Sequence, residues 1–518
     1  MKPLKGLILG SAAGIMAVSG AHAADLPVKA KAIEYVKVCS LYGPGFYYIP
    51  GTDTCIKLGG YLRAEIALAT NSDYNGAYSG VGGARNRLSN YYTARSREDL
   101  NIDTRIATEY GVLRTFFDAA FSWTSDSYVG NGTGATVYSP IGPPPFSAAP
   151  ANANAGAIAG GTLGMYYAFI QFAGLTIGKA VSQFDTPWTN YPSNTFDGLV
   201  GGSGSVTGVN QFSYTADFGQ GVTGSLSLQD ATAYYQGNLY NVGAGLTSAA
   251  GFGAGGYGPN DFGGTRVPDV VGMLRVDQAW GLFQLSAAAH NNHAAYYGAT
   301  ETTGHPDDKW GWAVQAALSI KNIPTGPGDT INVQAVYTDG ATRYNFQSLA
   351  TTSFAMFGGT SVPGAYQSVG LATAADGVFG AGTGISTVQT WGMRGAFSHN
   401  WDPYWNTALY GAYAQVKYGN GGTALVCGAL ATLGAAVAGV TNCNPDFNLA
   451  QVGLITRWTP VKNLTFSADV TYSHLDQKYA GTLVVSAPGL TTIAKPGAAF
   501  ELKDQNTVSM LLRAQRVW

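Results

Sequence analysis

The stretch LTFSADVTYS, residues 464–473, alternates strictly between two kinds of side chain. Apolar residues occupy every second position, from Leu464 and Phe466 to Tyr472, and Thr, Ser or Asp lies between them. Because successive side chains of a β-strand point to opposite faces, this pattern predicts a strand with one apolar and one polar face.

The same period of two recurs along most of the chain. Short links of two to four residues alternate with long links rich in Gly, Ala, Ser, Asn and Pro, such as 124–162 and 339–387. We count sixteen predicted strands, at 56–69, 95–108, 112–123, 163–173, 175–182, 209–217, 222–234, 268–279, 282–292, 309–321, 330–338, 388–400, 404–418, 447–459, 464–474 and 506–518.

A large soluble β-sandwich would also alternate, so the period alone does not decide the fold class. Long links on every second connection, an even strand count and aromatic residues at segment ends together favour a membrane barrel. The aromatic residues in question are Trp123, Trp310, Trp405, Trp458 and Tyr472. An open sheet would leave unpaired edges in hydrocarbon, so we expect a closed, all-β, antiparallel transmembrane barrel over 56–518, with short periplasmic turns and long extracellular loops.

The composition fits a protein whose surface partly faces lipid. Charged residues make up 11% of the chain, against ~25% in ordinary soluble domains. With a formal net charge of −2, nothing indicates a nucleic-acid partner. Residues 1–23 have a basic start, a short apolar run and the sequence AHA, which predicts a cleaved export signal.

Four cysteines form two pairs of equal spacing, with 15 residues between Cys39 and Cys55 and 15 between Cys427 and Cys443. In an exported chain such an even set indicates disulfides, and the two local pairs close the shortest loops. Sequence alone leaves the connectivity open. Metal binding is disfavoured because no C-x-x-C or neighbouring histidine is present. The apolar stretch 424–440 is built of Ala and Gly, and we interpret it as a loop.

The mature N-terminus carries the most specific motifs. ADLPVKA at 24–30 precedes EYVKVCSLYGPGFYYIPGTDTCIKLGGYLR at 34–63, which contains the paired cysteines and the GGYLR strand. These motifs strongly resemble the alphaproteobacterial outer-membrane porin family. The resemblance implies a homotrimeric channel in outer-membrane lipid for passive diffusion of small hydrophilic solutes and ions, without catalysis or cofactor. Residues 24–55 then lie on the periplasmic side, and whether they enter the lumen stays open.

The last segment, 506–518, places Val508, Met510, Leu512 and Trp518 on one face, so we expect it to close the barrel against the first strand. Its terminal Trp518 looks like the signal that outer-membrane proteins present to the barrel-assembly machinery. Phe is commoner there, and Arg516 falls on the lipid-facing register. An Arg near the interface can reach water with its head group at little cost.

Selectivity in such a channel depends on lumen charges and on a loop folded inward, and porin architecture implies that the third long loop, 183–208, is that loop. The predicted constriction set is Arg63, Arg105, Arg114, Arg394 and Arg513 facing Asp185 and Asp197, with lumen acids Glu65, Asp103, Asp118 and Asp469. Opposed charges would set a transverse field across the pore. Alternatively, the arginines pair with neighbouring carboxylates and only stabilise the wall.

Three other functions compete with general diffusion. An enzyme is disfavoured, because HNNH at 290–293 lacks a third metal ligand and no catalytic triad is recognisable. A surface adhesin or receptor would use the long loops. A substrate-selective channel would need an aromatic track along the lumen, and the lumen candidates Tyr61, Phe116 and Tyr410 are scattered.

Overall fold

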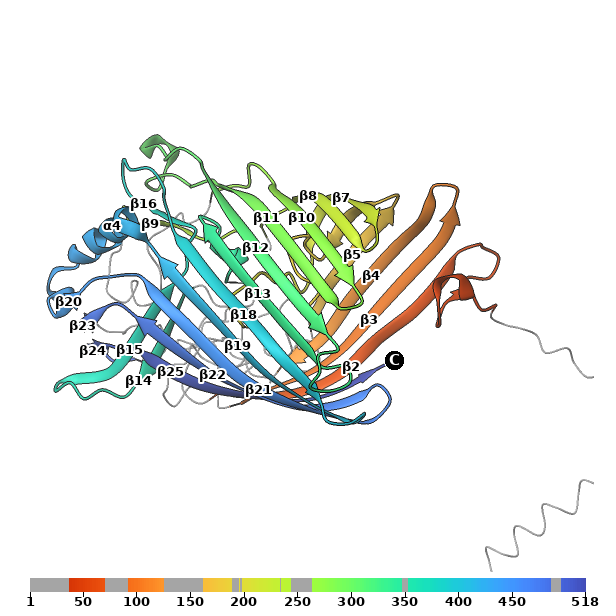
Figure 1. Ribbon diagram of the computed structural model, residues 1–518. Coiled ribbons are helices and arrows are strands. Elements are labelled where there is room, and N and C mark those ends of the chain that lie inside the picture. The colour runs from red at the N-terminus through yellow and green to blue at the C-terminus, as the bar shows by residue number, and fades with distance from the viewer. Residues whose placement is uncertain are drawn as a thin grey trace, which may run out of the picture.

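The computed structural model describes residues 37–69, 92–124, 162–188, 195, 198–232, 234–243, 263–346, 353–485 and 495–518. Its main body is a single antiparallel sheet that closes on itself into a barrel, whose strands run side by side along a common slanted direction (Figure 1).

Sixteen long strands form the barrel wall, and a two-residue strand, β1 (Tyr47–Tyr48), is attached to the first of them. The sheet closes because β2 pairs with β25, from Tyr61 opposite Val517 to Ala69 opposite Ser509. The barrel strands are β2 (Cys55–Ala69), β3 (Tyr92–Thr108), β4 (Gly111–Thr124), β5 (Thr162–Phe172), β6 (Leu175–Ala180), β7 (Val209–Gly219), β8 (Val222–Gln229), β10 (Asp269–Gln278), β11 (Gly281–Asn292), β12 (Lys309–Lys321), β13 (Thr330–Asp339), β18 (Gln389–Asn400), β19 (Trp405–Lys417), β21 (Phe447–Val461), β22 (Leu464–Gln477) and β25. The last runs over Gln505–Val517.

The strand count, the antiparallel pairing and the closure predicted from the sequence are therefore confirmed, with boundaries mostly within three residues. The prediction 222–234 is too long, because β8 ends at Gln229. The chain turns there, since the amides of Tyr234 and Tyr235 both donate to the carbonyl of Ala231. Both tyrosines are then buried among inward-facing side chains, where the period of two no longer applies.

The outward face of the barrel is apolar, as the alternation requires. In β12, Trp312 and Val314 are exposed while Ala313 and Gln315 are buried in the lumen. At one end, Trp405 stacks on Trp458 and Trp458 on Phe466, and all three are exposed on the outside. A continuous exposed apolar surface with aromatic residues at its rim is the surface that a bilayer covers.

The two ends of the barrel differ. At the turn end the strands are joined by short links, such as Ala173–Gly174 and Gln220–Gly221, whose positive φ angles of 48°, 83°, 53° and 76° give tight hairpins. At the loop end the connections are long. They carry the short helical turns η2 (Glu301–Thr303), η3 (Thr342–Tyr344) and η4 (Gly434–Val437) and the helix α4 (Gly419–Ala431).

Loops at the loop end fold into two small sheets that the sequence did not predict. One has the order β14-β15-β24-β23-β20, formed by β14 (Ser353–Gly358), β15 (Ala365–Thr373), β20 (Val440–Asn442), β23 (Ala480–Val485) and β24 (Ala498–Leu502). The other has the order β17-β16-β9, formed by β9 (Leu239–Asn241), β16 (Gly377–Phe379) and β17 (Ser386–Thr387). We call the five-stranded sheet and α4 together the cap.

The cap has an apolar core that it shares with the lumen wall. Phe357 and Val369 of the cap are fully buried, and they belong to one cluster with Phe447, Leu449 and Leu475 of the barrel. Near the loop end, apolar side chains therefore fill the lumen along β19, β21 and β22. Part of the stretch 424–440, interpreted above as a loop, forms α4 and η4 instead, and no described helix is long and apolar enough to cross a membrane.

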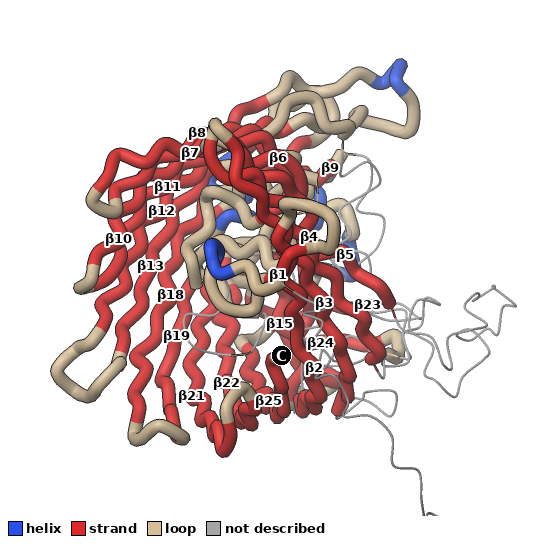
Figure 2. The backbone as a smooth tube through the Cα atoms, turned by 90° about the vertical axis from the view of Figure 1, so that its right-hand side faces the viewer, coloured by secondary structure: helices blue, strands red, loops and turns tan. Residues whose placement is uncertain are grey.

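Both local cysteine pairs are disulfide-bonded, Cys39 to Cys55 and Cys427 to Cys443, as the spacing predicts. The first fixes the segment 37–54, with η1 (Ser40–Tyr42) and β1, to the start of β2. In Figure 2, β1 projects within the ring of strands. Lys57 and Arg105 of the lumen face lie 5.9 Å and 4.9 Å from the ring of Phe46, so this segment covers the lumen wall at the turn end.

Asp329 in the turn between β12 and β13 supports a pH-dependence prediction. Its buried carboxylate accepts hydrogen bonds from Thr325 (2.6 Å), His399 Nδ1 (2.6 Å) and the Asn400 amide (2.8 Å). Burial opposes its ionisation, but these bonds prevail and lower its pKa from 3.8 to about 2.

The carboxylate should therefore stabilise the barrel fully above about pH 4 and lose this contribution as the pH falls from 3.8 to about 2. We expect Asp329→Asn to lower the melting temperature at pH 7 and to make it less sensitive to pH in that window, as measured by thermal unfolding in micelles. Asp402→Asn, in an exposed turn, is the control. An unchanged pH profile for Asp329→Asn would contradict the assignment.

Candidate functional site

The described residues of the loop 181–208 are 181–188, 195 and 198–208, and we call them the inserted loop. They lie inside the barrel and contact the wall on several strands. Amide side chains of the wall hold its backbone: Gln315 donates to the Phe184 carbonyl (3.0 Å), and Gln451 accepts from the Val200 amide (3.0 Å). Gln334 accepts from the Trp188 indole (2.9 Å). A glutamine amide both donates and accepts, so it can pair with backbone groups as another strand would. The predicted inward folding of this loop is confirmed.

Asp185 lies inside the inserted loop and is fully buried. Its carboxylate accepts from Ser203, from the Ser205 amide (2.6 Å) and from the Tyr235 hydroxyl (3.2 Å). Burial raises the pKa of Asp185, and these hydrogen bonds act in the opposite direction. The residue proposed to face the pore thus holds the two arms of the loop together and does not present its charge to water.

Arg394, another predicted constriction residue, is 1% exposed. Its guanidinium donates to the Leu199 carbonyl (3.3 Å) and to the Ser203 carbonyl (2.6 Å) of the inserted loop. A buried guanidinium needs acceptors on several sides, and backbone carbonyls of the loop supply two of them. Arg394 therefore positions the loop on β18 and is not part of the water-facing wall.

Arg513 and Glu65 meet where β2 and β25 close the barrel. Arg513 Nε lies 2.7 Å from Glu65 Oε2, and Arg95 Nη1 lies 3.2 Å from Glu65 Oε1. Arg513 also donates to the Thr195 carbonyl of the inserted loop (3.3 Å). Thr195 in turn donates to Asp469, through its amide (2.7 Å) and its hydroxyl (2.8 Å). Asp469 is fully buried, so this acid anchors the loop.

Arg105 and Arg114 lie together nearer the turn end. Both bind the carboxylate of Asp103, at 2.8 Å and 3.0 Å between Nη2 and Oδ2. Their guanidinium groups stack on rings, Arg105 on Phe46 (4.9 Å) and Arg114 on Phe116 (4.9 Å). The predicted constriction residues Arg63, Arg105, Arg114 and Arg513 thus share the lumen wall of β2–β4 and β25.

The carboxylates of these ion pairs lie deeper than the guanidinium groups. The side chains of Arg105 and Arg114 are 29% and 26% exposed against 10% for Asp103. The side chains of Arg95 and Arg513 are 12% and 10% exposed against 1% for Glu65. Water and ions in the lumen therefore meet the cationic partner of each pair, although the numbers of acids and bases on the wall are similar.

Arg63 and Arg97 differ from the arginines of these ion pairs, because their hydrogen-bond acceptors on the wall are neutral. They lie directly opposite each other on β2 and β3. Arg63 donates to Gln515 (2.9 Å) and Arg97 to Ser122 (2.8 Å), both neutral groups. Arg63 stacks over the Tyr61 ring (4.4 Å), and Arg97 lies over the Tyr166 ring (5.6 Å). Neither makes an ion pair with an acid in the described part of the chain.

Two predicted acids add no solvent-facing charge to the described wall. Asp118 lies on the lumen face of β4, as predicted, but it is buried beside Asp99, with which it shares a hydrogen bond. Asp197 lies outside the described residues. Sequence reasoning missed Arg95, Arg97, Tyr166 and the glutamines that hold the inserted loop. The alternation of β3 already places Arg95 and Arg97 on the polar face with Asp103 and Arg105. Tyr166 carries no such signal, because it lies at a β-bulge between Met165 and Tyr167.

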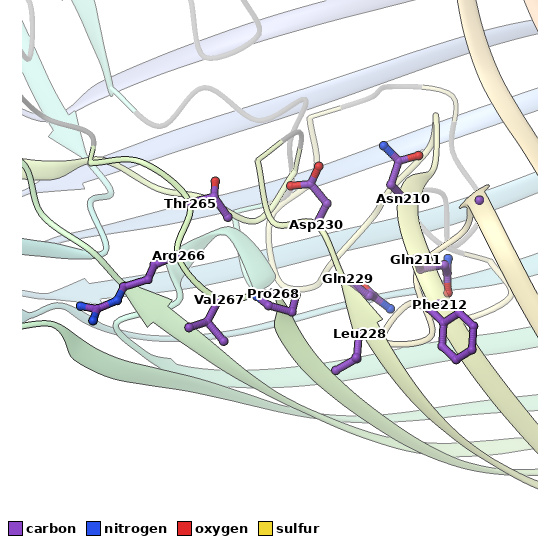
Figure 3. Close-up of a pocket in the computed structure, with 11 residues that line it drawn as sticks. Asn210, Gln211, Phe212, Leu228, Gln229, Asp230, Thr265, Arg266, Val267 and Pro268 are labelled. Carbon is purple, nitrogen blue, oxygen red and sulfur yellow. The ribbon is translucent and has the colours of Figure 1, made fainter.

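The remaining candidates lie away from the arginine-rich lumen wall of β2–β5. The histidines of HNNH are held separately, His290 by Asp269 (2.7 Å) and His293 by Asp308 (2.7 Å), and the described residues contain no cluster of three metal ligands. A cleft of about 450 Å³ near the loop end is lined by polar Asn210, Asp230 and Arg266 above Phe212 and Leu228 (Figure 3). Phe212 and Leu228 are exposed on the outer face of the barrel, so this cleft is not on the lumen path.

A closed sixteen-stranded barrel with an apolar outside, a polar lumen and an inserted loop defines a transmembrane β-barrel of the outer-membrane type. The family described as the Porin subfamily matches residues 25–511, and the chain belongs to this family. Porin Omp2b of Brucella suis biovar 1 is 31% identical over 285 residues, which cover 54% of this chain and 63% of Omp2b. Omp2b of Brucella canis is also 31% identical, over 289 residues with the same coverage.

The chain thus spans less than two thirds of the length of these relatives. Among solved structures, the outer membrane channel DcaP of Acinetobacter baumannii has a TM-score of 0.55 at 13% sequence identity. The similarity covers 91% of this chain and 99% of DcaP, and at that identity it bears on the fold alone.

Arg394 supports a prediction about the inserted loop. Arg394→Met keeps the length of the side chain and removes both hydrogen bonds to the loop carbonyls. Hydrogen bonds to charged groups contribute ~1.5–3 kcal/mol each. Together the two bonds correspond to about 3–6 kcal/mol, so we expect amide hydrogen exchange over 198–205 to become about a hundredfold to ten-thousandfold faster.

Exchange would be followed by mass spectrometry of the folded protein in micelles. Arg105→Met, which removes a lumen arginine without a contact to the inserted loop, is the matched control and should leave exchange over 198–205 unchanged. Equal acceleration by both variants would show a general loosening of the barrel and contradict the anchoring role of Arg394.

Proposed function

We propose that this chain forms a water-filled channel of the outer membrane, through which small hydrophilic solutes and ions diffuse passively. The observation that carries the proposal is the half-buried lumen wall of β2–β5, whose arginine side chains are reached by solvent inside a barrel that is apolar outside. Such a wall is of use only where water and polar solutes pass. Membership of the porin family supports the same function.

The passage should follow the β2–β5 side of the barrel. On the opposite side, lumen residues of β18 and β19 such as Ala396, Ala408, Ala412 and Ala414 are buried against the inserted loop and the cap. A polar solute entering from the loop end would therefore move along the arginine-rich wall. We therefore propose that the constriction lies between that wall and the inserted loop.

The proposed channel prefers anions. In each ion pair of the wall the guanidinium is the more exposed partner, and Arg63 and Arg97 add two cations that make no ion pair within the described residues. A low-dielectric wall focuses this field into the lumen, so anions are concentrated and cations are repelled. Because exposed charges are screened within ~3 Å at 1 M salt and ~10 Å at 0.1 M, the preference should be strongest in dilute salt.

Membership of the porin family is the basis for proposing an oligomeric state and an assembly route. We propose a homotrimer that is inserted by the barrel-assembly machinery, with Trp518 as part of the recognition signal, and we assign no catalytic step to it. Trp518 packs at the closure, where its amide donates to the Gly60 carbonyl (3.1 Å) and its indole to Glu98 (3.2 Å). Native mass spectrometry of the folded protein would test the trimer.

Single-channel recording in a planar bilayer under a salt gradient tests the channel itself. Ohmic conductance steps with a reversal potential of the anion-selective sign are expected. A correctly folded barrel that gives no steps, or steps of the cation-selective sign, would contradict the proposal.

The double variant Arg105→Gln with Arg114→Gln tests the source of the preference. It leaves Asp103 unpaired on the wall, so the cation-to-anion permeability ratio should rise about fivefold in 0.1 M KCl, corresponding to ~1 kcal/mol of electrostatic energy. Arg516→Gln removes a charge from the outer face, near the Lys462 carbonyl, and should leave the reversal potential unchanged. A shift of equal size in Arg516→Gln would place the selectivity outside the lumen.

A further inference from the structure

Two half-buried arginines and two tyrosines form a compact group on the lumen wall, which we call the arginine–tyrosine site: Tyr61, Arg63, Arg97 and Tyr166. Arg63 and Arg97 face each other across β2 and β3, and each is stacked on one of the tyrosine rings. Tyr61 also forms a hydrogen bond with Arg97, which joins the two halves.

Two cationic side chains directly opposite each other in a sheet repel one another. Elsewhere on this wall an acid relieves such repulsion, as Asp103 does between Arg105 and Arg114. Here the wall acceptors are the neutral Gln515 and Ser122, and each arginine uses only its Nε for them. Asp99, opposite Tyr61 on β3, attracts both arginines, but it is 3% exposed and shares a hydrogen bond with Asp118. Solvent in the lumen therefore meets the two half-buried guanidinium groups and not this acid.

The second tyrosine reaches the site through an irregularity of the sheet. The register between β4 and β5 shifts at Asp118 and Ala119, so Tyr166 is the extra residue of a β-bulge. Bulges commonly re-aim a side chain near a functional site. In a regular strand Tyr166 and Tyr167 would point to opposite faces, whereas here Tyr166 lies by Arg97 and Tyr167 donates to the Val206 carbonyl of the inserted loop (2.7 Å).

From this geometry we infer that the arginine–tyrosine site binds planar organic carboxylates, with benzoate as the simplest probe. This inference rests on the proposed channel and names the solute class that its wall retains. The carboxylate would bridge the two guanidinium groups, which match it as planar forks. The ring of the solute would lie along the flat faces of the guanidinium groups and the tyrosines.

The test is a titration of the folded, full-length protein in micelles with 4-fluorobenzoate, followed by fluorine NMR, with acetate and cyclohexanecarboxylate as competitors. Stacking of a planar ring should make benzoate bind about three- to tenfold more tightly than acetate. Cyclohexanecarboxylate, which is as apolar but not planar, should compete no better than acetate. Equal competition by all three carboxylates would overturn the inference, because the site would then recognise charge alone.

Variants separate the two parts of the site. The double variant Arg63→Gln with Arg97→Gln should weaken benzoate binding at least tenfold. Arg63→Lys keeps the charge and loses the planar fork, so it should retain acetate binding and lose most of the preference for benzoate. Tyr166→Leu should lose the preference as well.

Arg275→Gln is the matched control, because Arg275 is a lumen arginine of β10 that also donates to a neutral glutamine, Gln284 (2.9 Å). It should leave benzoate binding unchanged, and an equal loss in this variant would overturn the inference. Binding in micelles does not depend on conduction. A barrel that binds benzoate without conducting would refute the channel alone, and one that conducts without discriminating benzoate from acetate would refute the site alone.

Discussion

The structure depends on one constraint: in hydrocarbon, every backbone amide and carbonyl must find its partner within the protein. The pairing of β2 with β25 meets this requirement, because it gives each of the sixteen strands a neighbour on both sides. Once the sheet is closed, its outer face can be apolar and its inner face polar. The charged and amide side chains of the chain are then concentrated on a single inner wall.

That inner wall serves two purposes on its two sides. Across β11–β13, β18 and β21, amide side chains and Arg394 hold the inserted loop, and apolar residues support the cap. Across β2–β5, arginines remain partly exposed over aromatic rings and buried acids. The first side is a packed core that happens to lie inside a barrel, and the second is the surface that solutes meet.

In each ion pair of this second side the carboxylate is more deeply buried than the guanidinium, and this difference makes the surface charge positive. A carboxylate such as Glu65 or Asp103 is small enough to lie against the sheet between two arginines. The longer guanidinium side chains reach past it while their stems stay packed on the wall. A nearly balanced set of charges can thereby present a cationic surface, which counting acids and bases does not reveal. The pair Arg63 and Arg97 extends that surface, because the acid near them, Asp99, is buried and shares a hydrogen bond with Asp118.

The sequence by itself determined the strands, their number, the closure and the turn and loop ends, and it favoured the local cysteine pairs without fixing them. These follow from local rules: the period of two, short turns with residues that tolerate positive φ, and short spacings between cysteines. It did not determine the cap, since β15 and β24 pair across more than a hundred residues and neither is amphipathic enough to be recognised alone. Nor did it separate Arg394 from Arg63, which occupy similar mid-strand positions. Only the tertiary structure decided that the inserted loop covers Arg394, and that a bulge turns Tyr166 toward Arg97, because both depend on which distant segments pack together.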